Sequence, residues 1–311
     1  MNNQIDKRHG RRVVVTGAGG NLGAKAVEAL AKTDWCEEVI GFYSPNRPPV
    51  IPKGAEAKAT AVVADLTDPN GDWRDHLSDV DTVVHFAAKN PVPESTWSDA
   101  ASSFEMTTNL GLASLQHGVS RFIFCSSNHA MGGYKDSPLN DQLGGAGGLK
   151  ESLAPAPGTR WDDGQKQIDS TPYGASKVMG ESFTASLAAN SGGRLSAISL
   201  RVGWALPGDN NPADISLSGS PTGQGSTSAA EGEEARTLRW FQGMWLSNED
   251  FDRLLFASIL ASSESWPAAS VIINGVSAND GSFWSLDAGR ALIGYAPQDN
   301  LYAAIGRKQG R

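Results

Sequence analysis

Short apolar segments recur along the chain and are separated by longer helical ones. Arg12–Thr16, the first apolar segment, is continuously apolar and β-branched rather than alternating, which is typical of a parallel strand buried on both faces. The predicted strands are Arg12–Thr16, Glu38–Phe42, Ala61–Ala64, Thr82–Phe86, Arg121–Cys125, Leu195–Leu200 and Ser270–Asn274. The helices predicted between them include Gly23–Lys32, Ser98–His117 and Tyr173–Asn190. Strands that alternate with helices predict an α/β protein with a doubly wound parallel sheet.

Two segments interrupt this rhythm. Gly132–Thr171 is rich in Gly, Pro and Asp, and Asp209–Glu234 is rich in Ser, Gly, Thr and Pro. Loops of this length in compact domains are usually lids or disordered segments. We expect the first to be a lid, because it joins two candidate site residues, Ser127 and Tyr173. For the second, the composition leaves order and disorder equally open.

The composition argues against several classes of protein. A net charge of −8 is unsuited to a general nucleic-acid or anionic-membrane surface. Two cysteines, Cys36 and Cys125, are too few for a disulfide framework, and no Cys/His spacing suits zinc or another metal. No apolar run approaches the roughly 18 residues of a membrane span, and Met1–Arg12 is polar and basic, unlike a signal peptide. We therefore expect a soluble cytoplasmic protein.

A glycine-rich segment, Thr16–Gly23, follows the first predicted strand and opens the first helix. Glycines let the backbone approach a pyrophosphate, and the N-terminus of the helix favours its negative charge. The order of strand, turn and helix is the one that a dinucleotide site requires. The residues expected at the pyrophosphate are Gly17, Gly20, Asn21, Leu22 and Gly23.

The end of the second strand departs from the usual NAD pattern. NAD-binding turns place Asp or Glu there to hold the ribose 2′-hydroxyl, but Gly41–Arg47 contains neither residue. Ser44 and Arg47 could instead receive a 2′-phosphate, because a guanidinium pairs well with phosphate. Alternatively, Arg47 is a solvated loop residue and backbone groups hold the hydroxyl. On balance the sequence favours NADP over NAD.

Tyr173 and Lys177 lie four residues apart on a predicted helix and so share one face. An ammonium near a phenol favours the phenolate, and a bound oxidised nicotinamide would add a second positive charge. Tyr173 is therefore a candidate base near neutral pH, with Lys177 as its partner. Ser127 ends the fifth predicted strand, at the sheet edge where ligands bind in such proteins.

The order of these motifs resembles the extended branch of the short-chain dehydrogenase/reductase superfamily. The segments that carry the resemblance are Thr16–Gly23, Ala64–Leu66, His85–Ala88, Ser126–Ser127 and Tyr173–Lys177. We accordingly expect a single Rossmann-type domain over residues 1–311. Residues 11–205 would form its cofactor-binding core and residues 206–311 mainly a substrate-binding region, with strand 270–274 returning to the sheet.

The resemblance also implies a role for each site residue. Ser127 would hydrogen-bond the substrate oxygen that Tyr173 deprotonates, and Lys177 would also bind the nicotinamide ribose. Asn109 would hold the active-site backbone or a relay water, unless it is an ordinary helix residue. The further cofactor contacts that the family implies are Asp65 and Leu66 at the adenine, Ala87 and Ala88 beside the dinucleotide, and Val202 at the carboxamide.

Ser126–His129 is similar to the corresponding segment of uronate dehydrogenases, which oxidise the anomeric carbon of a hexuronic acid to a lactone. This similarity implies that Asn128 and His129 contact sugar hydroxyls. A core histidine with satisfied hydrogen bonds is the alternative for His129. Trp204 and Trp245 could stack on a sugar face, although a tryptophan more often serves packing.

The distal end of the sugar is the point where the chain departs from that family. Uronate dehydrogenases hold the sugar carboxylate with an arginine, whereas Trp240 occupies the corresponding position here. Arg236 and Arg239 are the nearest basic residues, and Lys89 is the next candidate. A slip of one residue could restore the clamp, or the distal group of the substrate differs.

The sequence thus predicts an NAD(P)-dependent dehydrogenase that oxidises C1 of an aldose or sugar acid to a lactone. The alternative is an epimerase or reductase that acts on a sugar nucleotide or small carbonyl compound. A non-catalytic dinucleotide sensor is disfavoured, because both Tyr173 and Lys177 are present. The resemblance further implies a homodimer formed through Ser98–His117 and Tyr173–Asn190.

Overall fold

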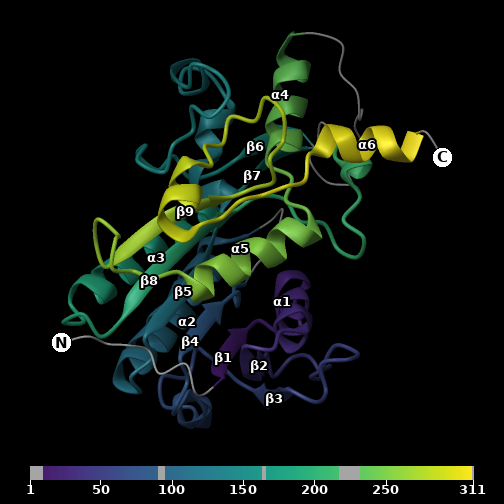
Figure 1. The fold of residues 1–311 in the computed structure, drawn as a ribbon. Helices are drawn as coiled ribbons and strands as arrows, with labels where there is room; N and C mark the ends of the chain where they lie inside the picture. The colour runs from purple at the N-terminus through teal and green to yellow at the C-terminus, as the bar shows by residue number, and fades with distance from the viewer. Residues whose placement is uncertain (1–9, 90–94, 163–165, 217–231, 310–311) are drawn as a thin grey trace.

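A computed structural model describes residues 10–89, 95–162, 166–216 and 232–309 of the chain. Its centre is a seven-stranded parallel sheet in the order β3-β2-β1-β4-β5-β8-β9 (Figure 1). The strands are β1 (Arg11–Thr16), β2 (Cys36–Tyr43), β3 (Ala59–Val63), β4 (Thr82–His85), β5 (Arg121–Ser127), β8 (Ser196–Val202) and β9 (Ser270–Gly275). The predicted doubly wound sheet is confirmed. Its strand order reverses between β1 and β4, where sheets of this kind bind ligands.

Helices cover both faces of the sheet. They are α1 (Asn21–Ala31), α2 (Trp97–Gln116), α3 (Thr171–Ala189), α4 (Gly232–Gly243), α5 (Asn248–Leu260) and α6 (Leu301–Gln309). Val13 and Val15 of β1 belong to the hydrophobic cluster that includes α1 and α5. Val14 belongs to the cluster on the opposite face, with α2 and α3. Burial on both faces is why β1 is continuously apolar.

A third hydrophobic cluster joins segments that are distant in the sequence. Met131 and Leu149, from the long segment after β5, pack with Trp240 of α4 and with Trp284 near the C-terminus. The long segment also contains the hairpin of β6 (Arg160–Asp162) and β7 (Gln167–Asp169). Figure 1 shows α4, α6 and this hairpin gathered at one end of the sheet.

Gly132–Thr171, the segment expected to be a lid, therefore contains short regular elements, and its role as a lid stays a prediction. Its apolar side chains are buried in the third cluster, and short 3₁₀ helices occur at Asn128–Lys135 and Asn140–Gln142. Of the second predicted loop, residues 217–231 lie outside the described part of the chain.

The expectations about membrane spans, metal sites and cysteines can be compared with the fold. In the described ranges, no helix is both long and apolar enough to cross a membrane, and no cluster of side chains suits a metal ion. Cys36 and Cys125 are both buried and free.

Candidate active site

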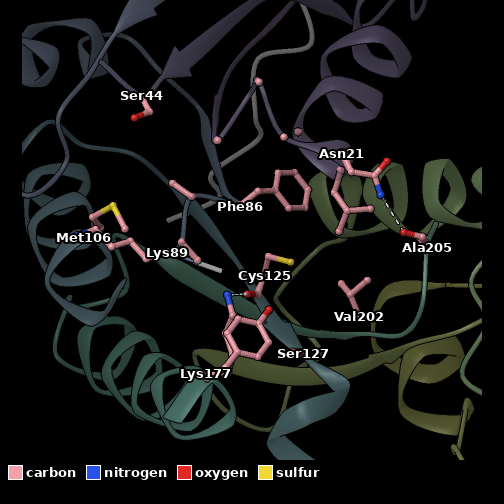
Figure 2. A pocket seen from close by; sticks show the side chains of 18 of the residues that line it. Asn21, Ser44, Phe86, Lys89, Met106, Cys125, Ser127, Lys177, Val202 and Ala205 are labelled. Atoms are coloured by element: carbon pink, nitrogen blue, oxygen red, sulfur yellow. Dashed lines mark hydrogen bonds between the residues drawn. The ribbon is translucent and has the colours of Figure 1, made fainter. Parts of the chain in front are cut away.

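A cavity of about 1290 Å³ opens at the carboxyl ends of β1, β2, β4, β5 and β8 (Figure 2). It is large enough for a dinucleotide together with a small substrate. All the predicted cofactor residues line it: Gly17, Gly20, Asn21, Leu22, Gly23, Ser44, Arg47, Asp65, Leu66, Ala87, Ala88, Tyr173, Lys177 and Val202. The fold thus brings motifs spread over two thirds of the chain to a single cavity.

The glycine turn between β1 and α1 leaves no room for side chains. Gly17 has φ +66°, and a Cβ atom there would lie 2.9 Å from the amide nitrogen of Ala87. A Cβ atom on Gly23 would lie 2.1 Å from the carbonyl oxygen of Gly17. Gly19 also lines the cavity and belongs to the same motif, although it was left out of the predicted set. This turn at the N-terminus of α1 fits a dinucleotide pyrophosphate.

Several predicted cofactor residues also have partners within the protein. The side-chain amide of Asn21 donates to the carbonyl oxygen of Ala205 at 2.8 Å, which ties the glycine turn to the segment after β8 (Figure 2). Asp65 accepts hydrogen bonds from the hydroxyl and the backbone of Thr67, and these bonds lower the pKa of its carboxyl group. Arg47 is exposed at the rim, beside Ser44.

Lys177 and Tyr173 are buried side by side on α3. The Lys177 Nζ atom lies 5.3 Å from the centroid of the Tyr173 ring and donates to the carbonyl oxygen of Cys125 at 2.8 Å (Figure 2). Only 4% of Lys177 and 9% of Tyr173 is exposed. The two side chains therefore share one face of α3, as the spacing of four residues predicted.

Ser127 is the last residue of β5 and lines the same cavity. Its Oγ accepts a hydrogen bond of 3.2 Å from the backbone N–H of His129. Because one lone pair is used in this way, the hydroxyl proton remains available for an oxygen atom in the cavity. Ser127 is therefore a hydrogen-bond donor in the same cavity as the candidate base, Tyr173, and its neighbour Lys177.

Asn109 does not join this group. It is absent from the cavity lining, and its amide donates to the carbonyl oxygens of Leu66 and Thr67, at 3.0 and 3.3 Å. The geometry therefore gives no support to a catalytic role. Asn109 instead fixes the turn after β3 that carries Asp65 and Leu66, because α2 runs past that turn.

Asn128, His129 and Trp204 line the cavity, as predicted for the sugar end. Asn128 Nδ2 donates to the carbonyl oxygen of Val202 at 3.2 Å. Burial lowers the pKa of His129 to about 4, so its imidazole is neutral near pH 7. The His129 and Tyr173 ring centroids are 5.4 Å apart. His129 is thus a pocket residue, not a core histidine.

Trp161, Phe241 and Met244 complete this end of the cavity, and the sequence did not single them out as site residues. Trp161 lies in β6, and its ring centroid is 6.1 Å from that of His129. Phe241 lies in α4, with its ring centroid 5.4 Å from that of Trp204. None of these residues belongs to a motif. They reach the site only because the third hydrophobic cluster folds over the end of the sheet.

The two candidate arginine clamps lie outside the cavity lining. Arg239 is exposed, donates twice to the carbonyl oxygen of Gly281 and lies over the ring of Phe283 at 4.9 Å. Arg236 approaches Glu233 at 3.7 Å on the same helix. The prediction of a clamp here is not supported, because neither arginine lines the cavity: Arg239 bonds Gly281, and the buried Nε of Arg236 has no hydrogen-bond partner among the described residues.

Trp245 and Lys89 also differ from their expected places. Trp245 is buried outside the cavity lining, and its indole N–H bonds to Asn210. Lys89 does line the cavity. Its charge makes a minor contribution, after the hydrogen bonds from Thr67, to lowering the pKa of Asp65. Lys89 therefore lies within electrostatic range of Asp65.

Residues 13–206 match the family model described as the NAD dependent epimerase/dehydratase family. The chain therefore belongs to this family, and the prediction of an NAD(P)-dependent enzyme is confirmed.

Characterised relatives resemble the chain over nearly its whole length. It is 29% identical to an L-arabinose 1-dehydrogenase (NAD(P)+) of Haloferax volcanii, over 94% of the chain and 99% of the relative. It is 27% identical to an NAD-dependent glucose-6-phosphate dehydrogenase of the same organism, over 93% of each chain. The solved structure of a mutant uronate dehydrogenase from Agrobacterium tumefaciens with NAD has the same fold: TM-score 0.66, 23% identity, 97% of this chain and 90% of that one.

Proposed function

We propose that this member of the NAD dependent epimerase/dehydratase family oxidises C1 of an uncharged aldose to the lactone. The observation that carries the proposal is the arrangement of Ser127, Tyr173 and Lys177 in the cavity that also contains the glycine turn. A candidate base and a hydrogen-bond donor beside a dinucleotide site suit the oxidation of an alcohol.

The protein's own groups handle the proton. Tyr173 takes the proton of the C1 hydroxyl, and the Ser127 hydroxyl donates to the same oxygen as the carbonyl forms. The Lys177 side chain lies beside the ring, where a positive charge would stabilise the phenolate that forms. NAD(P)+, when bound, supplies the acceptor for the hydride that leaves C1. Loss of that hydride and of the hydroxyl proton converts the cyclic hemiacetal to a lactone.

For the cofactor we propose a preference for NADP. Ser44 and Arg47 line the cavity at the end of β2, where no carboxylate stands to hold a 2′-hydroxyl. A guanidinium there would pair with the 2′-phosphate. We also propose that residues 11–205 form the cofactor-binding core, with residues 206–311 contributing mainly to the substrate side through Phe241 and Met244.

The charge of the cavity supports an uncharged sugar. Its described lining contains only three cationic side chains, Arg47, Lys89 and Lys177. Arg47 follows β2, Lys89 lies within electrostatic range of Asp65, and Lys177 is held beside Tyr173. The other lining residues named at the aromatic end, Asn128, Trp161, Trp204, Phe241 and Met244, are uncharged, and the internal segments 90–94, 163–165 and 217–231 contain no Arg or Lys. A sugar carboxylate or phosphate at the aromatic end would lack a cationic partner.

A substrate screen tests this function directly. Formation of reduced nicotinamide is followed with neutral aldoses, uronic acids and sugar phosphates, each with NAD+ and NADP+. We expect turnover with neutral aldoses, with kcat/KM at least about tenfold above that for the anionic sugars. Arg236→Ala and Arg239→Ala serve as matched variants and should change kcat/KM by less than about threefold. An epimerase would produce no net reduced nicotinamide. A preference for anionic sugars would contradict the proposal that the substrate is uncharged.

The proposed assembly is a homodimer formed through α2 and α3. A surface hollow of about 420 Å³ between these helices is lined by Phe104, Val178, Met179, Ser182, Phe183 and Ser186. Leu112 and Met179 are 46% and 41% exposed on the same helices. Exposed apolar surface on neighbouring helices suits an isologous contact. Light scattering at micromolar concentration should give the dimer mass.

We propose that the protein is located in the cytoplasm, where the free thiols of Cys36 and Cys125 would stay reduced.

A further inference from the structure

Ser170 is the residue immediately before α3, but its hydroxyl does not cap that helix. Asp169 accepts the hydrogen bond from the backbone N–H of Thr171 instead. The Ser170 Oγ lies 2.6 Å from Nδ1 of His129, and only 2% of Ser170 is exposed. The hydroxyl of a serine just before a helix usually accepts a hydrogen bond from a backbone N–H of that helix, so the orientation of Ser170 needs another explanation.

The hydrogen bonds around Ser170 determine which ring nitrogen of His129 carries the proton. The backbone N–H of Thr159 donates to the Ser170 Oγ at 2.8 Å, so this oxygen is an acceptor there. Its single proton has two possible acceptors, Nδ1 of His129 at 2.6 Å and the carbonyl oxygen of Thr159 at 3.3 Å. Hydroxyl donors prefer distances of about 2.5–3.0 Å, so Nδ1 is the better acceptor.

The neutral state of His129 completes the assignment. Burial lowers the pKa of this residue to about 4, so near pH 7 one ring nitrogen carries a proton and the other accepts. If Nδ1 accepts from Ser170, then Nε2 carries the proton. His129 lines the cavity, and no described residue forms a hydrogen bond with its Nε2. The free N–H is thus available to a ligand in the cavity, which Tyr173 and Trp161 also line.

We propose that Ser170 is a positioning residue that holds His129 in the Nε2–H form, so that His129 donates to an oxygen of the sugar. This inference rests on the proposed function. It adds that the sugar is recognised by a neutral donor, which suits the lone pairs of a hydroxyl or ring oxygen and needs no anionic group. The same network positions Trp161, because Thr159 lies two residues before it, and the backbone N–H of Gly158 donates to the carbonyl oxygen of His129 at 2.9 Å.

The first test measures the tautomer without any substrate. Long-range ¹H–¹⁵N spectra of protein with ¹⁵N-labelled histidine separate the Nδ1–H, Nε2–H and doubly protonated forms. His129→Gln identifies the His129 signals among those of the five histidines. We expect Nε2–H in the unsubstituted protein near pH 7 and a mixture of tautomers in Ser170→Ala. An Nδ1–H form in the unsubstituted protein would overturn the inference, whatever the enzyme oxidises.

The second test uses turnover. Ser170→Ala should raise KM for the best aldose about three- to tenfold, which corresponds to the loss of one neutral hydrogen bond. The kcat and the KM for the dinucleotide should stay nearly unchanged. Ser170→Thr keeps the hydroxyl, so its KM should stay close to that of the unsubstituted protein.

Ser191→Ala is the matched control, because it also removes a buried hydroxyl that accepts a backbone N–H and donates to a carbonyl, but it touches no histidine. An equal rise in KM for Ser191→Ala would mean a merely structural effect and would overturn the inference. If no sugar is oxidised but the tautomer depends on Ser170, the proposed function fails and the positioning role stands.

Discussion

The two ends of the cavity are built in different ways. At the dinucleotide end, Gly17 and Gly23 contribute backbone and open space within one contiguous motif. At the aromatic end, proposed for the sugar, the lining includes the side chains of His129, Trp161 and Phe241, from three segments far apart in the sequence. Recognition by backbone constrains a few adjacent residues and leaves a readable motif. Recognition by side chains only needs suitable groups to meet in space, so it leaves no local pattern.

Charge separates the two ends as well. Of the cations in the described lining, Arg47 follows β2, Lys89 lies within electrostatic range of Asp65, and Lys177 lies beside Tyr173. The aromatic end is neutral, and its histidine stays in the neutral form because burial lowers its pKa. The first end should therefore respond to changes of charge and backbone space, and the second to changes of shape and hydrogen bonding.

The largest effect is expected where the two ends meet, at Tyr173. Tyr173→Phe keeps the ring beside Lys177 and His129 but removes the oxygen that takes the proton. We expect kcat to fall by roughly 10³-fold, within the range for general-base loss, with dinucleotide affinity nearly unchanged in a fluorescence titration. Tyr134→Phe is the control, since Tyr134 lies outside the cavity lining and its hydroxyl donates to the carbonyl oxygen of Ala154. A kcat within about tenfold of the parent would remove Tyr173 from the mechanism.

The next effect belongs to the dinucleotide end alone. In Gly23→Ala the new methyl group would lie 2.1 Å from the carbonyl oxygen of Gly17, so the turn has to move. We expect dinucleotide binding to weaken about 100-fold by calorimetry, in line with the cost of forcing a methyl group into a packed site. Gly306→Ala is a matched helical control with no atom within 4 Å of the added methyl. Unchanged binding in Gly23→Ala would mean that the turn does not hold the dinucleotide.

A smaller change should distinguish the two cofactors. Arg47→Ala removes the cation proposed for the 2′-phosphate, so KM for NADP+ should rise about tenfold at low salt, and KM for NAD+ less than twofold. Steady-state kinetics at two ionic strengths provide the measurement. Arg290→Ala, outside the cavity lining, is the control. Equal changes for both cofactors would show that Arg47 does not discriminate between them.

The smallest effect is expected from pH at the sugar end. Burial lowers the pKa of His129 from its ordinary 6.5 to about 4. Because the folded-state pKa is depressed, the imidazole gains a proton only as pH falls towards 4, and it stays neutral from about pH 6 to 9. KM for the sugar should therefore be flat over that range. A rise in KM with a midpoint near pH 6.5 that disappears in His129→Gln would contradict the neutral donor.

The sequence by itself determined the sheet, the glycine turn and the pairing of Tyr173 with Lys177. Each depends on local spacing: apolar runs specify strands, a strand-to-helix turn needs glycine, and residues four apart share a helix face. The same local patterns placed Ser127 at the carboxyl edge of the sheet.

Only the tertiary structure decided the rest. Asn109 bonds the turn after β3, and the arginines of α4 lie outside the cavity lining, because helix orientation depends on long-range packing. Trp161 reaches the cavity because the segment after β5 buries its apolar side chains in the third cluster. The Ser170 hydroxyl bonds His129 and accepts from the backbone N–H of Thr159, while Asp169 accepts from the first backbone N–H of α3. Such contacts arise from the burial of apolar surface by the whole chain, so no segment encodes them alone.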